Sequence, residues 1–384
     1  MSIVCRENVE LAPSLVTEVI TDTEQFRELR AEWTELLQDS GSDCLFLSWE
    51  WMFSWWQHLS SSRKLHLITV RDRGMLVAIA PLTLCPPNFK RLRPCRALEF
   101  LASGTVGSDY LSFLIRRGYE EVALAEIGAS LTKANVMLEL VRVESTSFVM
   151  TATALELKQA GWRPMRQTTN YSPFINLKGH TWDSYCETLA YSHRRDIRRK
   201  LANLNKTFNV RFERVETEEQ RVDAMARFID LHLTRWADDG GSTALESEAL
   251  KQFHLSLSKV ALERGWLRLY TLWLDDRPGA IVYLFRYADT FYYYQASFDK
   301  EFGKYGVGML TLAMAIKAAC EEGAAEFDFL HDDELYKYLW AREERELIRL
   351  DLFPPKYSGA AIRNAAILKS EIKRVLAGFT EMAK

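Results

Sequence analysis

Tyr292–Trp340 reads YYYQASFDKEFGKYGVGMLTLAMAIKAACEEGAAEFDFLHDDELYKYLW, and this stretch decides the fold of the chain. Its beginning, within Phe291–Phe298, is rich in aromatic residues and holds no proline or glycine, which predicts a β-strand. Gly303–Gly308 then contains three glycines, which is typical of a turn. Met309–Glu322 has apolar residues at helical spacing, and Phe327–Leu330 reads as a short strand. The predicted order is strand, glycine turn, helix, strand, and then a dense polar cluster.

The glycine turn lies where a phosphate could bind. Glycines let the backbone approach an anion closely, and the helix after the turn offers the free N–H groups of its first residues. No Gly-Lys-Ser/Thr follows the turn, so it is not a P-loop, and the glycine spacing of dinucleotide-binding folds is absent. Two interpretations stay open: the glycines bind an anion, or they only close a tight connection between strand and helix.

The spacing Gly303-x-x-Gly306-x-Gly308 resembles the pyrophosphate-binding turn of the GNAT acyltransferases, Gln/Arg-x-x-Gly-x-Gly/Ala. The resemblance implies that the donor is acyl-CoA, either acetyl-CoA or another acyl-CoA. It also implies that the donor pyrophosphate binds at Gly303, Gly306, Val307 and Gly308. Because Gly303 takes the place of the usual Gln or Arg, the contact made by that side chain is missing here.

The polar cluster Asp328–Trp340 is similar to a second signature, Asp-Phe-Leu-Arg-Gly-Asp-Glu-Pro-Tyr-Lys-x-x-Trp. This signature belongs to the BioF2-like, or CelD (BcsL)-type, acetyltransferases, which are relatives of the FemAB transferases. The matching residues are Asp328, Phe329, Leu330, Asp333, Glu334, Tyr336, Lys337 and Trp340. His331, Asp332 and Leu335 stand where the signature has Arg, Gly and Pro, and the missing Gly leaves the geometry of that turn open.

This resemblance implies an α/β fold of two GNAT-like (FemAB-like) domains, each a mixed central sheet flanked by helices. It implies an N-acyltransferase that moves an acyl group, in the first instance acetyl, from acyl-CoA to an amine. The acceptor would be an amino sugar of an exopolysaccharide or cell-envelope precursor, sugar-linked or lipid-linked and anionic. A FemAB-like alternative is the transfer of an amino acid from aminoacyl-tRNA.

The pattern of strands also favours two similar halves. Leu65–Leu84 and Trp266–Tyr287 each read as a strand, a charged turn with glycine and a second strand. We expect Thr168–Phe174 to link the halves. The predicted boundaries are residues 1–165 for the first domain, 166–356 for the second, and 357–384 for a C-terminal amphipathic helix.

Two stretches of the first half allow two interpretations each. Ser48–Leu59 is an aromatic helix that either packs in a core, the interpretation we favour, or forms the wall of an acceptor groove. Ser103–Tyr110 is a polar loop rich in glycine and serine that either binds an anion or only connects two elements. For this loop we favour the connector.

Direct acyl transfer needs a bound thioester, a neutral amine and a proton donor for the leaving thiolate. The candidate residues are Asp328, His331, Glu334, Tyr336 and Lys337 for catalysis, and Tyr294, Gln295 and Trp340 for contact with the substrate. Asp328, His331 or Glu334 could accept the proton of the amine, directly or through water. Tyr336 could protonate the thiolate, and Lys337 could hold a phosphate or carboxylate. The competing interpretation is that Asp328 and Glu334 only cap or pair with nearby arginines.

A basic helix is predicted within Trp182–Asn205. On a helix, Arg194 and Arg198 share one face, and Arg195 and Arg199 share another. Because guanidinium groups suit phosphates and carboxylates, we expect these four side chains to bind an anionic acceptor. The run could instead be an ordinary solvated face. Its R-x-x-x-R spacing also fits a regulatory module that binds a cyclic dinucleotide.

Length and composition exclude several classes. The chain has 384 residues, 48% of them hydrophobic, which predicts two domains with large cores. A net charge of -3 and a pI of about 6.2 argue against a tRNA partner. The six cysteines include no C-x-x-C pair, so we expect no metal site and free thiols in a reducing compartment. No signal peptide or long apolar window is present, which predicts a cytoplasmic protein, with peripheral binding to the inner membrane as an open possibility.

Overall fold

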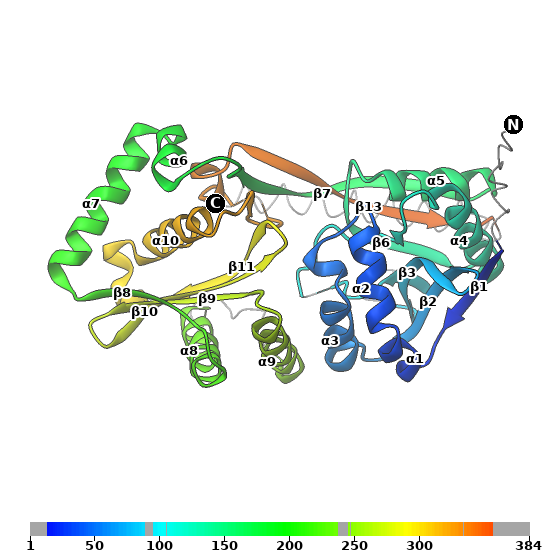
Figure 1. The fold of residues 1–384 in the computed structure, drawn as a ribbon, viewed down its shortest axis with the longest axis horizontal. Coiled ribbons are helices and arrows are strands. Elements are labelled where there is room, and N and C mark those ends of the chain that lie inside the picture. The colour runs from blue at the N-terminus through cyan, green and yellow to red at the C-terminus, as the bar shows by residue number, and fades with distance from the viewer. Residues whose placement is uncertain are drawn as a thin grey trace, which may run out of the picture.

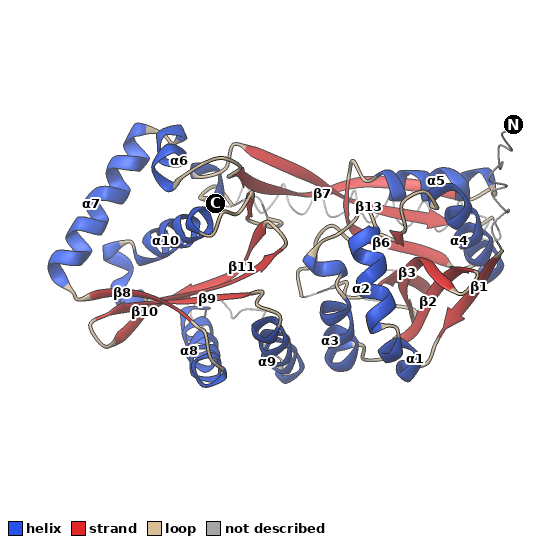
Figure 2. Cartoon of the chain, viewed as in Figure 1, coloured by secondary structure: helices blue, strands red, loops and turns tan. Residues whose placement is uncertain are grey.

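Strands from both halves of the chain join one mixed sheet, and helices cover its faces (Figures 1 and 2). The computed structural model describes residues 14–88, 95–104, 106–236, 245, 247–332 and 334–355. The strands in these ranges are β1 (Leu15–Ile20), β2 (Lys64–Asp72), β3 (Met75–Cys85), β4 (Ala97–Phe100), β5 (Leu114–Ile115), β6 (Met137–Glu144), β7 (Arg163–Asn176), β8 (Val210–Arg214), β9 (Leu267–Leu274), β10 (Arg277–Tyr287), β11 (Thr290–Phe298), β12 (Glu326–Asp328) and β13 (Glu343–Phe353). The α-helices are α1 (Thr23–Glu28), α2 (Arg30–Asp39), α3 (Trp49–Leu59), α4 (Glu120–Ala134), α5 (Phe148–Gln159), α6 (Trp182–Thr188), α7 (Tyr191–Thr207), α8 (Glu218–Trp236), α9 (Glu248–Glu263) and α10 (Val307–Glu321).

The strand order is nearly symmetric about its centre. It runs β1-β2-β3-β4-β6-β13-β7-β12-β11-β10-β9-β8, with β5 beside β3. On one side of the central pair, β4 and β6 are parallel and α4 lies between them in the chain; on the other side, β11 and β12 are parallel and α10 lies between them. An antiparallel run of four strands precedes each parallel pair. The predicted α/β class, with a mixed sheet flanked by helices, is confirmed, and the repeat agrees with two similar halves. The separate sheet expected in each half is instead part of one continuous sheet.

The two halves share their central strands. β7 and β13 pair antiparallel over their whole length, from Arg163 opposite Phe353 to Phe174 opposite Glu343. Each strand crosses from one half to the other: the last residues of β7 pair with β12, and the last residues of β13 pair with β6 (Figure 1). Thr168–Phe174, which we expected to link the halves, is part of β7 and so lies in a strand that runs from one half into the other. Most side chains of β7 are exposed, which explains the polar composition that made it look like a linker.

The predicted boundary between the two domains falls in the central pair of strands, β7 and β13. The predicted boundary between residues 165 and 166 falls inside β7, so it stays a prediction. The predicted amphipathic helix at residues 357–384 and the motif residue Asp333 lie outside the described residues.

Within the described ranges, no helix is both long and apolar enough to cross a membrane. The five cysteines in these ranges are free thiols.

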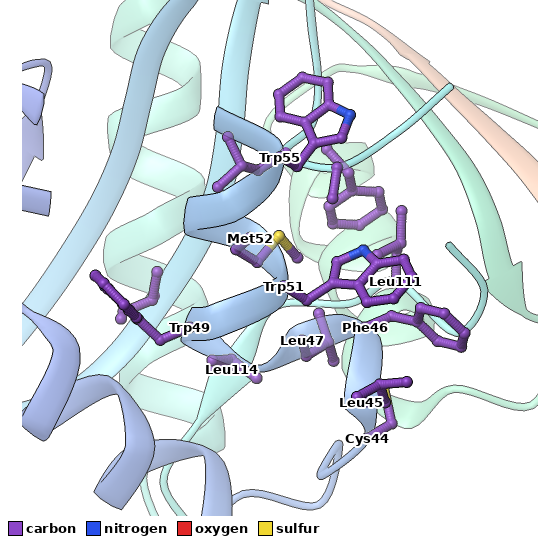
Figure 3. Packing of buried hydrophobic residues seen from close by; sticks show 14 of the residues in the cluster. Cys44, Leu45, Phe46, Leu47, Trp49, Trp51, Met52, Trp55, Leu111 and Leu114 are labelled. Atoms are coloured by element: carbon purple, nitrogen blue, oxygen red, sulfur yellow. The ribbon is translucent and has the colours of Figure 1, made fainter. Parts of the chain in front are cut away.

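The aromatic helix α3 packs in a core that spans both halves (Figure 3). Ser48 accepts a hydrogen bond from the backbone N–H of Trp51 and so caps the start of the helix. The Trp51 ring is fully buried and contacts Phe253, Phe285 and Tyr294 of the second half at centroid distances of 5.6–5.9 Å. The core interpretation of this helix is therefore confirmed. Through the contact of Trp51 with Tyr294, α3 of the first half packs against β11 of the second half.

Candidate active site

β11 and β12 separate beyond a short paired region. They pair in parallel only over Thr290–Tyr292 and Glu326–Asp328. Against β10, β11 has a β-bulge, because Tyr283 pairs with Gln295 while Leu284 pairs with Tyr293. Tyr294 is therefore an extra residue, and a bulge of this kind bends its strand. The second half of β11 turns away from the chain that follows β12.

A pocket of 630 Å³ fills the opening between β11 and the segment after β12, and we call it the splay pocket. Its volume lies in the range of about 300–1,000 Å³ that is typical of small-molecule sites. Its wall includes the first turn of α10 and the end of α8, together with Val106 and Gly107 from the first half. The predicted site residues that line it are Tyr294, Gln295, Gly308, His331, Glu334, Tyr336, Lys337 and Trp340. The structure therefore brings together half of the residues chosen from the sequence.

The glycine turn leads into the helix that borders this pocket. A 3₁₀ turn, Lys300–Tyr305, contains Gly303 and ends at Gly306, which precedes Val307 at the start of α10. Gly306 has φ 74° and ψ 32°, a left-handed conformation that glycine adopts without strain. With glycine at the N-cap, no side chain occupies the N–H groups of the first turn. These groups and the helix dipole can bind an anion.

The basic helix α7 lies beside this turn and not in the splay pocket. A Cβ atom on Gly306 would lie 2.8 Å from Cδ and 3.2 Å from Nζ of Lys200, so the lysine side chain crosses the turn. Lys200 also pairs with Asp196 at 3.2 Å. At the other end of α7, the ring of His193 packs on Trp340 with centroids 4.5 Å apart. The helix is thus fixed against both the glycine turn and the polar motif.

The four arginines chosen from the sequence differ in their surroundings. Arg194 is half-buried, and its Nε has no hydrogen-bond partner. Arg195, Arg198 and Arg199 are exposed. Arg195 lies over the ring of Tyr191, and Arg199 pairs with Asp196 on the same helix. None of the four lines the splay pocket.

His331 is held by a carboxylate from the other half of the chain. Its backbone N–H donates to Asp109 Oδ2 at 2.7 Å, and its Nδ1 lies 3.0 Å from the same oxygen. Asp109 is fully buried. An ionised carboxylate can only accept, so Nδ1 carries a proton, and in the neutral imidazole the lone pair is on Nε2, which lies 3.8 Å from the carboxylate of Asp332. His331 lines the splay pocket and can therefore act there as a general base.

The backbone around His331 is unusual on both sides. Leu330 and Asp332 have φ values of 58° and 77°, in a region that residues other than glycine rarely adopt. Asp332 occupies the position where the signature has glycine, and it keeps the left-handed conformation. Its side chain accepts a hydrogen bond from Asn170 Nδ2 at 3.2 Å. Gly107 lies against the imidazole, because a Cβ atom there would be 2.9 Å from His331 Cε1.

Lys337 supports this segment from within. It is buried, and Nζ donates to the carbonyl oxygens of His331 at 2.7 Å and Asp332 at 2.8 Å. Its third partner is the carboxylate of Glu334 at 2.7 Å. Because an ammonium group has three hydrogens, all are used inside the protein. These contacts favour a role for Lys337 in positioning the segment, and its predicted contact with a substrate phosphate or carboxylate stays a prediction.

Tyr336 remains a candidate proton donor. Its hydroxyl is hydrogen-bonded to that of Tyr293, which also lines the splay pocket. Burial of the hydroxyl raises the pKa of Tyr336, and burial raises the pKa of Tyr293 to about 12. Both phenols are therefore protonated at neutral pH, so Tyr336 carries the proton that a departing thiolate would need.

Asp328 faces away from His331. Successive side chains of a strand point to opposite faces, so Asp328 and Phe329 cannot face the same pocket. Asp328 lines a second cavity of 440 Å³, which we call the acidic pocket, whereas Phe329 lines the splay pocket. Its carboxylate accepts from Tyr110 Oη at 2.6 Å and from the backbone N–H of Leu330 at 2.7 Å, and it lies 3.5 Å from Arg345. The sequence grouped Asp328 with His331, and the structure separates them.

Burial raises the pKa of Asp328 to about 7, from an ordinary value near 3.8. The folded protein then holds a proton that the unfolded chain has lost, so the free energy of unfolding falls as the pH rises between these two values. Asp328→Asn removes this titration. From pH 5 to pH 8, urea unfolding should show wild type losing about 2–3 kcal/mol more stability than the variant, at about 1.4 kcal/mol per pH unit. Parallel pH profiles for the two proteins would contradict this.

The sequence missed the residues that the first half supplies. Asp109, Gly107 and Tyr110 belong to the loop that we expected to be only a connector. The signal was present in the polar composition of Ser103–Tyr110, but nothing in it indicates a contact with His331. Lys200 was also overlooked as a neighbour of the glycine turn.

Comparisons with known proteins agree with this architecture. Residues 191–338 match the family model described as Acetyltransferase (GNAT) domain, a region that runs from α7 through the glycine turn to the polar motif. A search of curated proteins found no match to the sequence.

Solved structures show the same fold along nearly the whole chain. The crystal structure of FemX superimposes with a TM-score of 0.62 and 13% identity, covering 90% of this chain and 99% of FemX. A conserved protein of unknown function from Bacteroides thetaiotaomicron gives a TM-score of 0.56 at 11% identity, covering 88% of this chain and 100% of that one. The C-terminal domain of a putative lysylphosphatidylglycerol synthetase from Agrobacterium fabrum gives 0.52 at 11%, covering 89% and 96%. This chain therefore has the fold of FemX, and residues 191–338 match an acetyltransferase (GNAT) domain.

Proposed function

We propose that this protein is an N-acyltransferase that moves an acyl group from acyl-CoA to an amine. The observation that carries the proposal is the splay pocket, which opens beside the N-terminus of α10 and has His331 in its wall. A thioester in this pocket would lie between a site for phosphates and a general base. The match of residues 191–338 to an acetyltransferase (GNAT) domain supports this choice of reaction.

Two buried polar groups support an elongated donor in the splay pocket. Gln295 Oε1 and Ser297 Oγ line the pocket and have no hydrogen-bond partner. A buried polar atom without a partner is costly, so a ligand that satisfies both would bind more tightly. The pantetheine arm of CoA carries amide groups that can donate to the first and accept from the second.

The donor phosphates would bind at the glycine turn. Gly306 and Gly308 allow close approach of the backbone, and α10 presents its N-terminus. Lys200 already lies across this turn and supplies a cation. We therefore infer that α7 serves the phosphates of the donor.

The chemistry follows from the groups around the pocket. His331 Nε2 accepts a proton from the amine as the amine nitrogen bonds to the thioester carbon. The carbon–sulfur bond then breaks, and the Tyr336 hydroxyl gives its proton to the departing thiolate. The proton that His331 took from the amine returns to the Tyr336 phenolate through solvent, which restores both groups. The products are an amide and CoA with a free thiol. Asp109 keeps the imidazole in the tautomer that this step requires.

The identity of the acceptor is a finer proposal. The resemblance of the stretch Asp328–Trp340 to the CelD-type signature favours an amino sugar of an exopolysaccharide or cell-envelope precursor. That acceptor, its binding by Arg194, Arg195, Arg198 and Arg199, a cyclic dinucleotide at the same arginines, and peripheral membrane binding through residues 357–384 all stay predictions. The amino sugar acceptor is tested by incubating the protein with acetyl-CoA and glucosamine and measuring the release of the CoA thiol. A protein that consumes aminoacyl-tRNA and ignores acetyl-CoA would support the FemAB-like alternative.

Lys200→Met should weaken acetyl-CoA binding about tenfold, since it keeps the aliphatic chain over Gly306 and removes one charge. The double variant Arg195→Ala/Arg199→Ala is the control, because it removes two exposed charges from the same helix. We expect the control to bind acetyl-CoA as wild type does in isothermal titration calorimetry. The opposite ranking would show that the exposed face of α7, and not Lys200, binds the donor.

A further inference from the structure

The acidic pocket is a negatively charged cavity built by both halves of the chain. Its volume is 440 Å³. The carboxylates in its wall belong to Asp43, Glu120, Glu144, Glu326 and Asp328. Among the described residues that line it, Arg345 is the single cation. Even with Asp328 protonated, the other four carboxylates outnumber the single guanidinium, so the wall carries more negative than positive charge.

Internal pairing leaves much of this charge without a cation. Arg345 is bound in bidentate fashion by Glu326, at 2.9 and 2.6 Å. Asp43 accepts from a tyrosine hydroxyl, and Glu120 accepts from a backbone N–H. Neutral donors of this kind satisfy lone pairs but leave the charge in place. Glu144 lies 3.8 Å from Arg345, which is already shared with two other carboxylates.

The rest of the wall also suits a cation. Tyr292 and Phe148 line the pocket, and aromatic faces attract ammonium groups. The Tyr110 ring also lines it, with the guanidinium of Arg345 over the ring. Ser112 lines it as well, is 4% exposed, and its Oγ has no hydrogen-bond partner. A hydroxyl can accept a hydrogen bond from an ammonium group. Carboxylates, aromatic rings and a free buried hydroxyl together match the chemistry of an organic cation.

The acidic pocket adjoins the proposed transfer site. The segment Asp328–Leu330 separates the two cavities, with Asp328 in one wall and Leu330 in the other. The loop that contains Gly107 and Tyr110 also lies between the two cavities, because Gly107 lines the splay pocket and Tyr110 lines the acidic pocket. Tyr110 donates to Asp328 at this boundary. The two cavities are therefore neighbours on either side of this boundary.

We propose that the acidic pocket binds the second positive charge of a diamine or polyamine acceptor, whose reacting amine enters the splay pocket. The proposal rests on the proposed function, since it names the class of acceptor for the same reaction. It makes the acidic pocket the part of the protein that selects among amines. An anionic acceptor would be repelled from it.

Binding of spermidine and of hexylamine, measured by calorimetry without acyl-CoA, tests the proposal. Wild type should bind spermidine at least about tenfold more tightly than hexylamine, and Glu120→Gln/Glu144→Gln should lose that preference. Both changes keep the shape of the side chain and remove its charge. Glu121→Gln is the matched control, because Glu121 is exposed in the same first turn of α4 and lies outside the pocket wall. It should bind spermidine as wild type does.

The outcomes separate this inference from the proposed function. Equal affinity for the two amines, or an unchanged preference in the double variant, would overturn the inference. Selective spermidine binding that depends on the two glutamates would support it even if acetyl-CoA does not bind. In that case the acyl-transfer proposal would fail while the cation site remained.

Discussion

Replacing His331 with alanine should lower kcat for acyl transfer by about 10²–10⁴-fold while leaving the affinity for acetyl-CoA within a few fold of wild type. The reason is that Nε2 is the free nitrogen of an imidazole whose Nδ1 is held by Asp109 at 3.0 Å. Loss of the base slows proton removal from the amine but does not touch the site proposed for the donor phosphates. Steady-state kinetics with acetyl-CoA and an amine acceptor give both constants.

Glu334→Gln is the matched control for this prediction. Glu334 lines the same pocket and was an equal candidate from the sequence, but it pairs with Lys337 at 2.7 Å. We expect its kcat to change less than about tenfold. If Glu334→Gln loses activity and His331→Ala keeps it, the base has been assigned to the wrong residue. The kcat of Asp109→Asn should lie between those of His331→Ala and Glu334→Gln. Its pH profile should shift, because the tautomer of His331 is no longer fixed.

Gly308→Glu should abolish measurable acetyl-CoA binding, a loss of at least about 100-fold. The new carboxylate would lie in the first turn of α10, where it would repel the donor phosphates and compete for the N–H groups. A Cβ atom at this position would lie 3.3 Å from Phe298 Cδ1, so part of the effect could be steric. Gly308→Ala controls for that contact, because it adds the Cβ atom without the charge.

Calorimetric titration of both variants separates charge from shape. We expect Gly308→Ala to bind acetyl-CoA within about fivefold of wild type, and circular dichroism to show that both variants are folded. Equal losses in the two variants would mean that crowding against Phe298 is responsible. If Gly308→Glu is folded and binds acetyl-CoA normally, the assignment of the donor phosphates to this turn is contradicted.

Local features of the second half could be predicted because they depend on neighbouring residues. The strand, glycine turn, helix and strand of Phe291–Leu330 follow from aromatic content, glycine spacing and helical periodicity, and the structure has β11, α10 and β12 in that order. The exchange of β7 and β13 between the halves could not be predicted. It depends on pairing between strands that are far apart in the chain, and the exposed face of β7 has the composition of a loop.

In the candidate site, too, features set by neighbouring residues could be predicted, and contacts between residues far apart in the chain could not. The polar motif after β12 was found from its sequence, but the partner of His331 lies 222 positions away and has no local signal. The strand predicted over Phe327–Leu330 did contain the information that Asp328 and Phe329 face opposite sides, since successive side chains of a strand alternate. Lys337 was assigned to a ligand because a lysine in a polar motif is usually exposed, whereas here it is buried under the backbone that it supports.

Hydrogen exchange measured with and without acetyl-CoA tests the central claim most directly. The account predicts slower exchange in the second half of β11 and in the first turn of α10, since these elements line the splay pocket and carry the glycine turn. It predicts no change in β4 and α4, the corresponding elements of the first half. Protection confined to β4 and α4, or no protection anywhere at saturating acetyl-CoA, would contradict the assignment of the splay pocket as the donor site.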